Sequence, residues 1–210
     1  TYEHEYILIF RKGGKRTFSG SQKKLRQKSA YFWEERNVWF SDLWDIKGTS
    51  QFIPCSKAGR DRSASFPLEI PYRLVNMYSA EGDTVLDPFL GLGTTSIACM
   101  ISKRNSIGVE IDPEIAELAL NTMDIPVSYA NRLIERRIEK HLEFIESLSD
   151  ENKKKCYLNI PHGFKVKTRQ ETAIELNMLE SIVSLDDGYV CRYKKCENTG
   201  THEQIKISFA

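Results

Sequence analysis

The chain has 210 residues, of which 40% are hydrophobic, and this is enough for one sizeable domain or one and a half. It contains no run of 18 apolar residues and no signal-peptide pattern, so we expect neither a membrane-spanning helix nor secretion. Its five cysteines favour free thiols in a reducing cytoplasm, and Cys191, Cys196 and His202 lack a well-spaced fourth ligand, so we expect no metal site.

The N-terminal part of the chain is basic, although the net charge of the whole chain is only +1. Residues 1–63 carry 13 Lys and Arg against 7 Asp and Glu, whereas residues 64–210 carry 17 against 22. The apolar run within residues 4–12 predicts a strand, and the stretch 11–28 that follows contains eight cations and no acid. This asymmetry indicates a basic recognition region on a mildly acidic body.

Aromatic residues follow the basic stretch closely, and all three tryptophans fall within residues 33–44. Because cations attract phosphates and aromatic rings can stack on bases, this region is predicted to bind DNA. The candidate DNA contacts are Lys15, Arg16, Lys23, Lys24, Arg26, Lys28 and Arg36. Two other interpretations stay open: the basic stretch as a solvated loop, and the tryptophans as core residues that anchor it.

The next segments predict a helix, a strand and a glycine-rich loop. Helical spacing over residues 68–78 predicts one buried face, made of Ile70, Leu74, Val75 and Tyr78. Residues 84–86 form a short β-prone run that leads into Asp87. In the loop, Gly91 and Gly93 allow a ligand to approach the main chain closely. Thr94 or Thr95 is then the expected N-cap of a helix that runs to about Ser102.

A second buried strand is predicted over residues 106–109, and Asp112 with Pro113 predicts the start of the next helix. Glu110 lies 19 positions after Gly91, where nucleotide-binding α/β sheets place a ribose-binding acid. Ser96 stands where a dinucleotide-binding loop has its third glycine, and Asp87 would repel a pyrophosphate. These two residues favour a cofactor with an amino acid moiety over NAD.

The last third of the chain predicts a long amphipathic helix and then short strands. The helix covers residues 127–148 and places on one side Leu133, Ile134, Ile138, Leu142 and Ile145. A polar linker is expected at 151–155. The β-prone runs are 165–168, 182–185, 189–193 and 205–209, with Asp186-Asp187-Gly188 as a hairpin turn. We interpret this part as an accessory α+β module or a sheet extension, which could touch DNA or a second subunit.

Two motifs carry a resemblance to a known family. The segment Asp-Pro-Phe-Leu-Gly-Leu-Gly-Thr-Thr at 87–95, followed by Gly-Val-Glu-Ile-Asp-Pro-Glu at 108–114, resembles the cofactor loop of DNA amino-methyltransferases of the "beta" motif order. In these enzymes the catalytic half precedes the cofactor half. The segment Ala64-Ser65-Phe66-Pro67 also resembles the family, whereas Arg62 and Ser63 depart from its pattern.

The resemblance covers about residues 1–125 and implies an α/β fold. This is a Rossmann-like methyltransferase sheet, partial in this chain, with a basic recognition insert and a C-terminal α+β extension. It implies four regions along the chain: a late strand of the catalytic half (1–12), the target-recognition region (13–61), the cofactor-binding half (62–126), and a C-terminal helix with an accessory α+β extension (127–210).

The resemblance also implies S-adenosylmethionine as the cofactor. Glu110 is expected to hold the ribose, Ile111 to pack on the adenine, and Asp87 with residues 64–66 to fix the methionine end. The full set of implied cofactor-binding residues is Ala64, Ser65, Phe66, Asp87, Pro88, Phe89, Gly91, Gly93, Thr94, Thr95, Glu110 and Ile111.

One family motif is absent from the chain. The family uses Asp/Asn/Ser-Pro-Pro-aromatic to accept hydrogen bonds from the target amino group and to stack on the flipped base. The seven prolines stand at 54, 67, 71, 88, 113, 126 and 161, so no two are adjacent. We expect the chain to be the C-terminal part of a longer enzyme. The alternatives are a split enzyme whose partner chain supplies the motif, and a non-catalytic cofactor- or DNA-binding subunit.

The activity that the resemblance implies is methylation of an exocyclic amino group in duplex DNA, in a restriction-modification system. The Phe66-Pro67 form favours cytosine N4 over adenine N6 as the target. An RNA guanine amino-methyltransferase is an alternative, because such enzymes share the Asp-Pro-Phe-x-Gly-x-Gly loop. They usually carry Asn-Pro-Pro-Tyr after this loop, and residues 96–210 contain no such motif.

Overall fold

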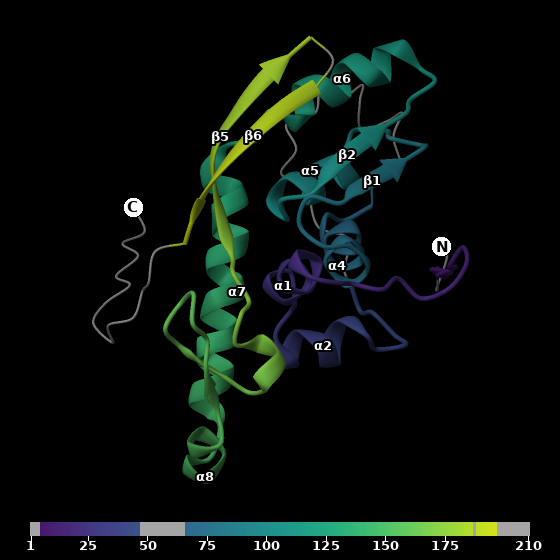
Figure 1. Cartoon of the computed structure of the whole chain (residues 1–210). Helices are drawn as coiled ribbons and strands as arrows, with labels where there is room; N and C mark the ends of the chain where they lie inside the picture. The colour runs from purple at the N-terminus through teal and green to yellow at the C-terminus, as the bar shows by residue number, and fades with distance from the viewer. Residues whose placement is uncertain (1–4, 47–65, 187, 197–210) are drawn as a thin grey trace.

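The computed structural model describes residues 5–46, 66–186 and 188–196. Its N-terminal and central elements are α1 (Ser21–Lys28), α2 (Trp33–Trp39), α4 (Glu69–Tyr78), β1 (Thr84–Asp87), α5 (Thr94–Ile101), β2 (Asn105–Gly108) and α6 (Pro113–Met123) (Figure 1). The C-terminal elements are α7 (Val127–Ser147), α8 (Asp150–Lys154), β3 (Tyr157–Leu158), β4 (Lys165–Val166), the 3-10 turn η1 (Arg169–Glu171), β5 (Asn177–Leu185) and β6 (Gly188–Lys195).

The centre of the fold is the parallel unit β1–α5–β2. The two strands pair in register from Thr84 with Asn105 to Asp87 with Gly108. One face of β1 is covered, because Val85 packs against a cluster formed by α4 and α5. A parallel strand pair joined by a crossover helix is typical of α/β proteins. The α/β class expected from the sequence is therefore confirmed, and the strand expected at 84–86 is present.

The start of α5 differs by one residue from the expectation. Gly93, not Thr94 or Thr95, is the N-cap, in the left-handed conformation with φ of 82°, and its carbonyl accepts the Ile97 N–H at 3.0 Å. A glycine adopts this conformation without the Cβ clash that a threonine meets. The start of α6 is as expected: Asp112 caps it by accepting the N–H groups of Glu114 and Ile115.

The second strand lies close to its expected position but is not buried. Among the described residues β2 pairs with β1 alone, and the strand has exposed side chains along its length. Leu86 and Ile107, which are paired across the two strands, are 61% and 56% exposed. Burial was expected because parallel sheets normally carry helices on both faces. Here the described chain covers only one face.

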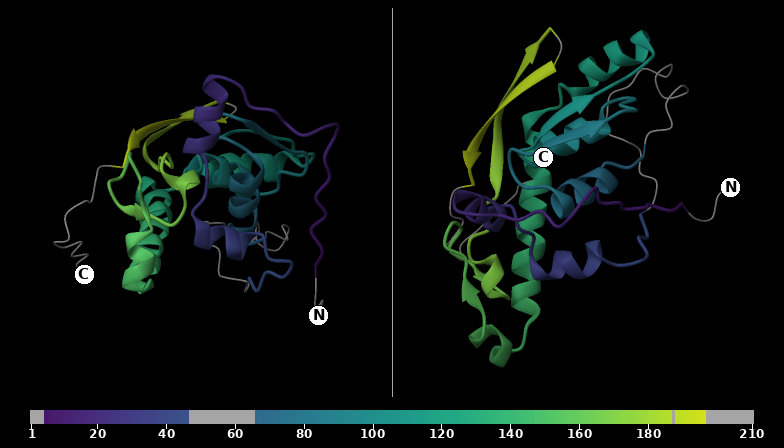
Figure 2. Two further views of the ribbon diagram at one scale, coloured as in Figure 1. Left: turned by 60° about the horizontal axis from the view of Figure 1, so that its bottom comes forward. Right: turned by 45° about the vertical axis from the view of Figure 1, so that its right-hand side comes forward.

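The strand expected within residues 4–12 is not formed over its described part. Residues 5–11 belong to no strand, and the side chains of residues 5–12 are exposed. They form an arm that stands away from the body of the molecule (Figure 2). An apolar run becomes a strand only when a neighbouring strand satisfies its backbone groups, and no described segment does so. His4 lies outside the described residues.

Helix α4 buries a different face from the one expected. Of the four apolar residues expected on the buried face, only Val75 is buried, and Tyr78 is exposed. Pro71, Arg73 and Asn76 are buried instead. The reason is a polar contact: the Asn76 amide donates to the Ser102 hydroxyl at 3.0 Å and to a carbonyl within α4. This polar bonding turns α4 away from the orientation that apolar spacing alone predicts.

Helix α7 agrees with the expected long amphipathic helix. Ile134, Ile138 and Ile145 are buried, while Leu133 and Leu142 are partly buried against the same core. The main core joins residues of α5, α6, α7 and β5 with Phe32, which is fully buried. The linker expected at 151–155 is wrong, since residues 150–154 form α8.

The C-terminal strands largely follow the expected pattern. The strand expected at 165–168 is β4, shorter than expected, and those expected at 182–185 and 189–193 are parts of β5 and β6. These two strands pair antiparallel up to Leu185 with Gly188, so the expected hairpin is confirmed. The hairpin lies along α7 (Figure 1). The run 205–209 lies outside the described residues.

Candidate functional site

The loop between β1 and α5 is held to the end of β2 by main-chain hydrogen bonds. The Val109 N–H donates to the Asp87 carbonyl and the Leu90 N–H donates to the Val109 carbonyl, each at 2.9 Å. The Asp87 carboxylate accepts the Phe89 N–H at 3.0 Å. The ends of the two parallel strands therefore form one rigid edge, which is where ligands bind in open α/β sheets.

The Glu110 carboxylate ties this edge together. Its Oε2 accepts the Gly91 N–H at 2.9 Å, and its Oε1 accepts the N–H groups of Ile111 at 2.9 Å and Asp112 at 3.0 Å. These donors, with Asp112 and Gly91 foremost, hold the pKa of Glu110 below its ordinary value, because they stabilise the ionised form. Glu110 is therefore an anion at neutral pH.

The same contacts limit what else Glu110 can accept. A carboxylate has about four acceptor positions, and three N–H groups of the chain already use three of them. One further hydroxyl can bind without change, whereas a diol that takes two bonds must displace a present donor. Of the three donors, the Gly91 N–H belongs to the loop after β1, whereas the other two directly follow Glu110 in the chain. The ribose role expected for Glu110 stays a prediction.

Two close contacts shape the loop, and sequence reasoning identified neither. A Cβ on Gly93 would lie 3.0 Å from the Cγ of Met123, at the end of α6. A Cβ on Gly108 would lie 2.5 Å from the Leu90 Cδ1, so any larger residue at this position would force the Leu90 side chain to shift. The glycine two positions before Glu110 was a signal in the sequence that could have indicated the second contact. Nothing in the sequence marked Met123.

Apolar side chains surround the polar edge. Phe89 is 87% exposed and Ile111 is 97% exposed, so both are available to cover a flat ligand beside Glu110. Thr94 is buried at the first turn of α5 and Thr95 is half-buried beside it, while Pro88 is exposed in the loop. Phe66 is also exposed. Ala64 and Ser65 lie outside the described residues, so the methionine-end contacts predicted for them stay predictions.

The predicted DNA-contact residues fall into two groups. Arg16 and Lys28 bind carboxylates of the chain itself: Arg16 makes a two-pronged contact with Asp83, and Lys28 lies 2.9 Å from Glu175. The Arg16 contact holds the pKa of Asp83 below its usual range. The side chains of the second group are exposed and lie on the segment before α1, on α1 and on α2: Lys15, Lys23, Lys24, Arg26 and Arg36.

The three tryptophans pack against the protein. Trp39 is buried, with the Arg137 guanidinium 5.3 Å from the centre of its ring. Trp33 stacks on Phe144 of α7, and the Trp44 indole N–H donates to the Trp39 carbonyl at 3.1 Å. The core-packing interpretation therefore accounts for these rings, although Trp33 keeps part of its surface exposed.

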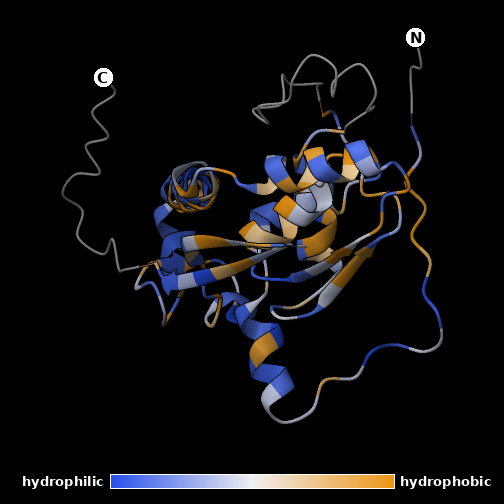
Figure 3. Cartoon of the chain, turned by 90° about the horizontal axis from the view of Figure 1, so that it is seen from above, coloured by the Kyte–Doolittle hydropathy of each residue, from blue (hydrophilic) through white to orange (hydrophobic). Residues whose placement is uncertain are grey.

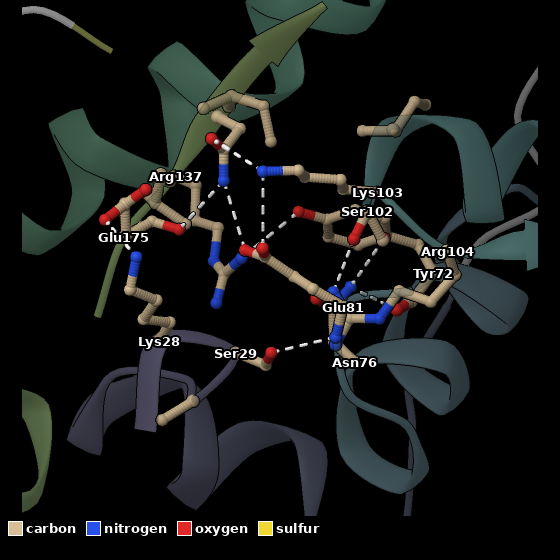
Figure 4. A pocket seen from close by; sticks show the side chains of 15 residues that line it. Lys28, Ser29, Tyr72, Asn76, Glu81, Ser102, Lys103, Arg104, Arg137 and Glu175 are labelled. Atoms are coloured by element: carbon tan, nitrogen blue, oxygen red, sulfur yellow. Dashed lines mark hydrogen bonds and ion pairs between the residues drawn. The ribbon is translucent and has the colours of Figure 1, made fainter. Parts of the chain in front are cut away.

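A polar junction joins four parts of the chain that are separated in sequence (Figure 4). Lys28 meets Glu175 there, the Glu81 N–H donates to the Ser29 hydroxyl at 2.8 Å, and Lys103 contacts Glu81 at 3.4 Å. The junction thus links the end of α1 to the turn before β1 and to the segment before β5.

Close to this junction, α7 contributes two buried polar side chains that sequence reasoning missed. Arg137 pairs with Glu35, with one contact at 2.8 Å, and His141 lies 2.7 Å from Glu34. Both residues interrupt the apolar side of the predicted helix, four positions apart. This interruption could have indicated the two contacts from the sequence, because a polar or charged side chain on a buried face needs a partner on the neighbouring element.

The described residues contain no group of three metal-ligating side chains, and Cys99, Cys156, Cys191 and Cys196 form no disulfide with one another. His202 lies outside the described residues. None of the helices in the described ranges has the length and apolar character needed to cross a bilayer.

Comparison with known proteins identifies the family. The family model for DNA methylases matches residues 1–121, which is more than half of the chain. The chain therefore belongs to the DNA methylase family, and the resemblance to DNA amino-methyltransferases is confirmed.

The curated relatives are type II methyltransferases. The chain is 51% identical over 178 residues to M.MthZI of Methanothermobacter thermautotrophicus, covering 84% of this chain and 48% of the relative. It is 50% identical over 141 residues to M.MjaI of Methanocaldococcus jannaschii, covering 63% of this chain and 45% of the relative. The chain spans about half the length of these relatives.

Solved structures of a Thermus thermophilus protein described as a DNA modification methylase are also similar. One is 39% identical and covers 53% of this chain and 39% of that chain, with a TM-score of 0.41. Another, in complex with S-adenosylmethionine, is 35% identical and covers 58% of this chain and 47% of that chain, with a TM-score of 0.43.

Proposed function

We propose that this chain supplies the S-adenosylmethionine-binding half of an enzyme that methylates exocyclic amino groups in duplex DNA. The observation that carries the proposal is the Glu110 carboxylate, which lies at the end of β2 and binds the backbone of the glycine-rich loop after β1. The membership of the chain in the DNA methylase family agrees with this assignment.

The residues at the edge of the sheet suit this cofactor better than a dinucleotide. Asp87 ends β1 with a carboxylate that attracts an ammonium group, and the same charge repels a pyrophosphate. Glu110 offers an acceptor to a ribose hydroxyl, and the exposed side chains of Phe89 and Ile111 can cover an adenine. The cofactor, when bound, supplies an electrophilic methyl group. The residues at this edge would bind the cofactor and orient it.

Calorimetry with S-adenosylmethionine tests the assignment. Replacing Glu110 with Ala or Gln should weaken binding at least tenfold, because a charge-assisted hydrogen bond to the ribose is lost. The control is Glu117→Gln on the exposed side of α6, which should bind like the unaltered chain. Equal affinity of all variants would remove Glu110 from the site.

We further propose that methyl transfer requires a segment with the Pro-Pro-aromatic motif, from the same longer chain or from a partner chain. No two prolines of this chain are adjacent, so it has no such motif. Two features support an outside segment: the uncovered apolar side of β1 and β2, and the exposed apolar arm. A strand added parallel to β1 would end beside Asp87, because parallel strands end at the same edge of a sheet.

Cytosine N4 is the favoured target in this proposal, on the basis of Phe66-Pro67, and the cellular role is in restriction-modification. The curated relatives are named as type II methyltransferases, which agrees with this role. Mass spectrometry of nucleosides from DNA methylated by the complete enzyme separates the two products. N6-methyladenine as the main product would reverse the preference.

A further inference from the structure

A long groove runs between the N-terminal arm and the body of the molecule. Its volume is about 2090 Å³, well above the roughly 300–1,000 Å³ of small-molecule pockets. One wall is the arm, the opposite wall is α4 and the start of β1, and the groove continues past α1 and α2 to η1. Its size leaves room for a macromolecular occupant.

The charged side chains that line this groove are mainly positive, and they lie beside apolar residues of the arm and of α4. Seven Lys and Arg side chains line it against two acids, Asp83 and Glu171. Both acids are already used within the protein. Asp83 binds Arg16, and Glu171 accepts the Trp33 N–H at 2.8 Å and bonds from Thr168. The charge left for an occupant is therefore cationic, which suits a polyanion and disfavours a second copy of this positively charged surface.

Two arginines from different helices line the groove. Arg26 of α1 and Arg36 of α2 both act on the Tyr31 hydroxyl, where their charges oppose the rise in its pKa that burial causes. Both side chains are exposed, and neither has an ion-pair partner among the described residues. Arg26 also lies over the Phe18 ring, 5.2 Å from its centre, which fixes its position. This pair is placed to bind neighbouring phosphates.

The C-terminal module adds a polar side chain to the same groove. Gln170 lies on η1, is exposed, and lines the groove. Thr168 and Glu171 close η1 with a capping box, and the Glu171 bond to the Trp33 N–H fixes the turn against the start of α2. Gln170 is therefore carried on a rigid support. An amide both donates and accepts, which is the chemistry that reads base edges.

We infer that η1 of the C-terminal module is part of the DNA-recognition surface, with Arg26 and Arg36 binding the backbone and Gln170 facing the bases or the adjacent sugar-phosphate chain. This inference rests on the proposed function and extends it beyond the matched family region, which ends at residue 121. Figure 3 shows the arm, which carries an apolar stretch, curving around one side of the molecule.

Salt-dependent fluorescence anisotropy with a random-sequence duplex tests the two arginines. Arg26→Ala and Arg36→Ala should each weaken binding about fivefold to tenfold and lower the slope of log affinity against log salt by about one. The matched control is Arg136→Ala, an exposed arginine on α7 that does not line the groove. Unchanged slopes for both variants would overturn the role of the two arginines in binding the DNA backbone.

A photo-crosslinking amino acid at position 170 tests the C-terminal contribution directly. Irradiation with the duplex should give a protein–DNA adduct, whereas the same group at Lys154 on α8 should give none. No adduct at 170, with unchanged affinity of Gln170→Glu, would overturn the role of η1. If the unaltered chain does not bind the duplex at all, the proposed function fails. Binding that survives every substitution contradicts only the inference.

Discussion

At the scale of single residues, Gly93 is the position where the candidate cofactor loop has least freedom. Replacing it with alanine should destabilise the protein by about 2–4 kcal/mol, because the left-handed backbone and crowding against Met123 both add cost. Gly82→Ala is the matched control: its φ is also positive, at 76°, but no atom lies within 4 Å of the added Cβ. It should cost only about 1–2 kcal/mol.

Denaturant unfolding measures both variants. A further Met123→Ala change should recover part of the Gly93→Ala loss if crowding is the cause, since it removes the side chain that the new methyl group meets. Equal losses at Gly93 and Gly82 would show that the backbone conformation alone matters.

Glu110 gives a prediction about pH. Its folded pKa is lowered by three backbone donors, so its contribution to stability is present above the ordinary carboxyl pKa of 4.5 and is lost as the pH falls through the folded value. Glu110→Gln should therefore be less stable than the unaltered chain at neutral pH, and the gap should narrow in the acid range. Thermal unfolding at a series of pH values measures this gap. A gap that stays constant would exclude the ionised carboxylate as its source.

At the scale of elements, the ion pair between Glu35 and Arg137 is one of the contacts that join α2 to α7. Glu35 accepts the Phe32 N–H as a cap of α2 and also binds Arg137 of α7. Arg137→Met should cost about 3–5 kcal/mol, because it leaves a largely buried carboxylate without its cation. The double change Arg137→Met with Glu35→Gln should cost less than the single one, and a double-mutant cycle measures the coupling. Strict additivity of the two changes would contradict the pairing.

Elements with strong local signals were predicted well from the sequence. The strand before Asp87, the helix cap at Asp112 and the turn between β5 and β6 each depend on residues within a few positions of one another. The arm, the exposed β2 and the orientation of α4 were predicted wrongly, because each depends on what packs against it. The spacing of apolar residues indicates which face of an element needs a packing partner, but it does not show which segment packs there.

At the scale of the whole molecule, methyl transfer by this chain alone should be undetectable on duplex DNA. The acceptors that align the target amine are absent, and transfer depends on that alignment. Adding a segment that carries the Pro-Pro-aromatic motif, from the longer chain or from a partner chain, should restore transfer of a labelled methyl group. A variant of that segment with the motif aspartate, asparagine or serine changed to alanine is the control. Transfer without any added segment would contradict the proposal.

The candidate site was predictable from the sequence only in part. The residues at the ends of β1 and β2 stand near one another in the chain, so their proximity followed from the strand order. The groove was not predictable, because its walls come from segments more than 100 positions apart, such as α1 and η1. The C-terminal module was expected as an accessory, and whether it acts as a separate region stays a prediction.

The polar junction has a consequence for engineering new target specificities. An exchange of residues 13–61 between relatives would replace Glu35, Glu34 and Lys28, which contact Arg137, His141 and Glu175 outside that segment. Such chimeras should express poorly unless the facing stretches of α7 and of the segment before β5 are exchanged together with the predicted recognition region. The boundaries of an exchangeable cassette are therefore set by three-dimensional contacts, and a useful cassette is discontinuous in sequence.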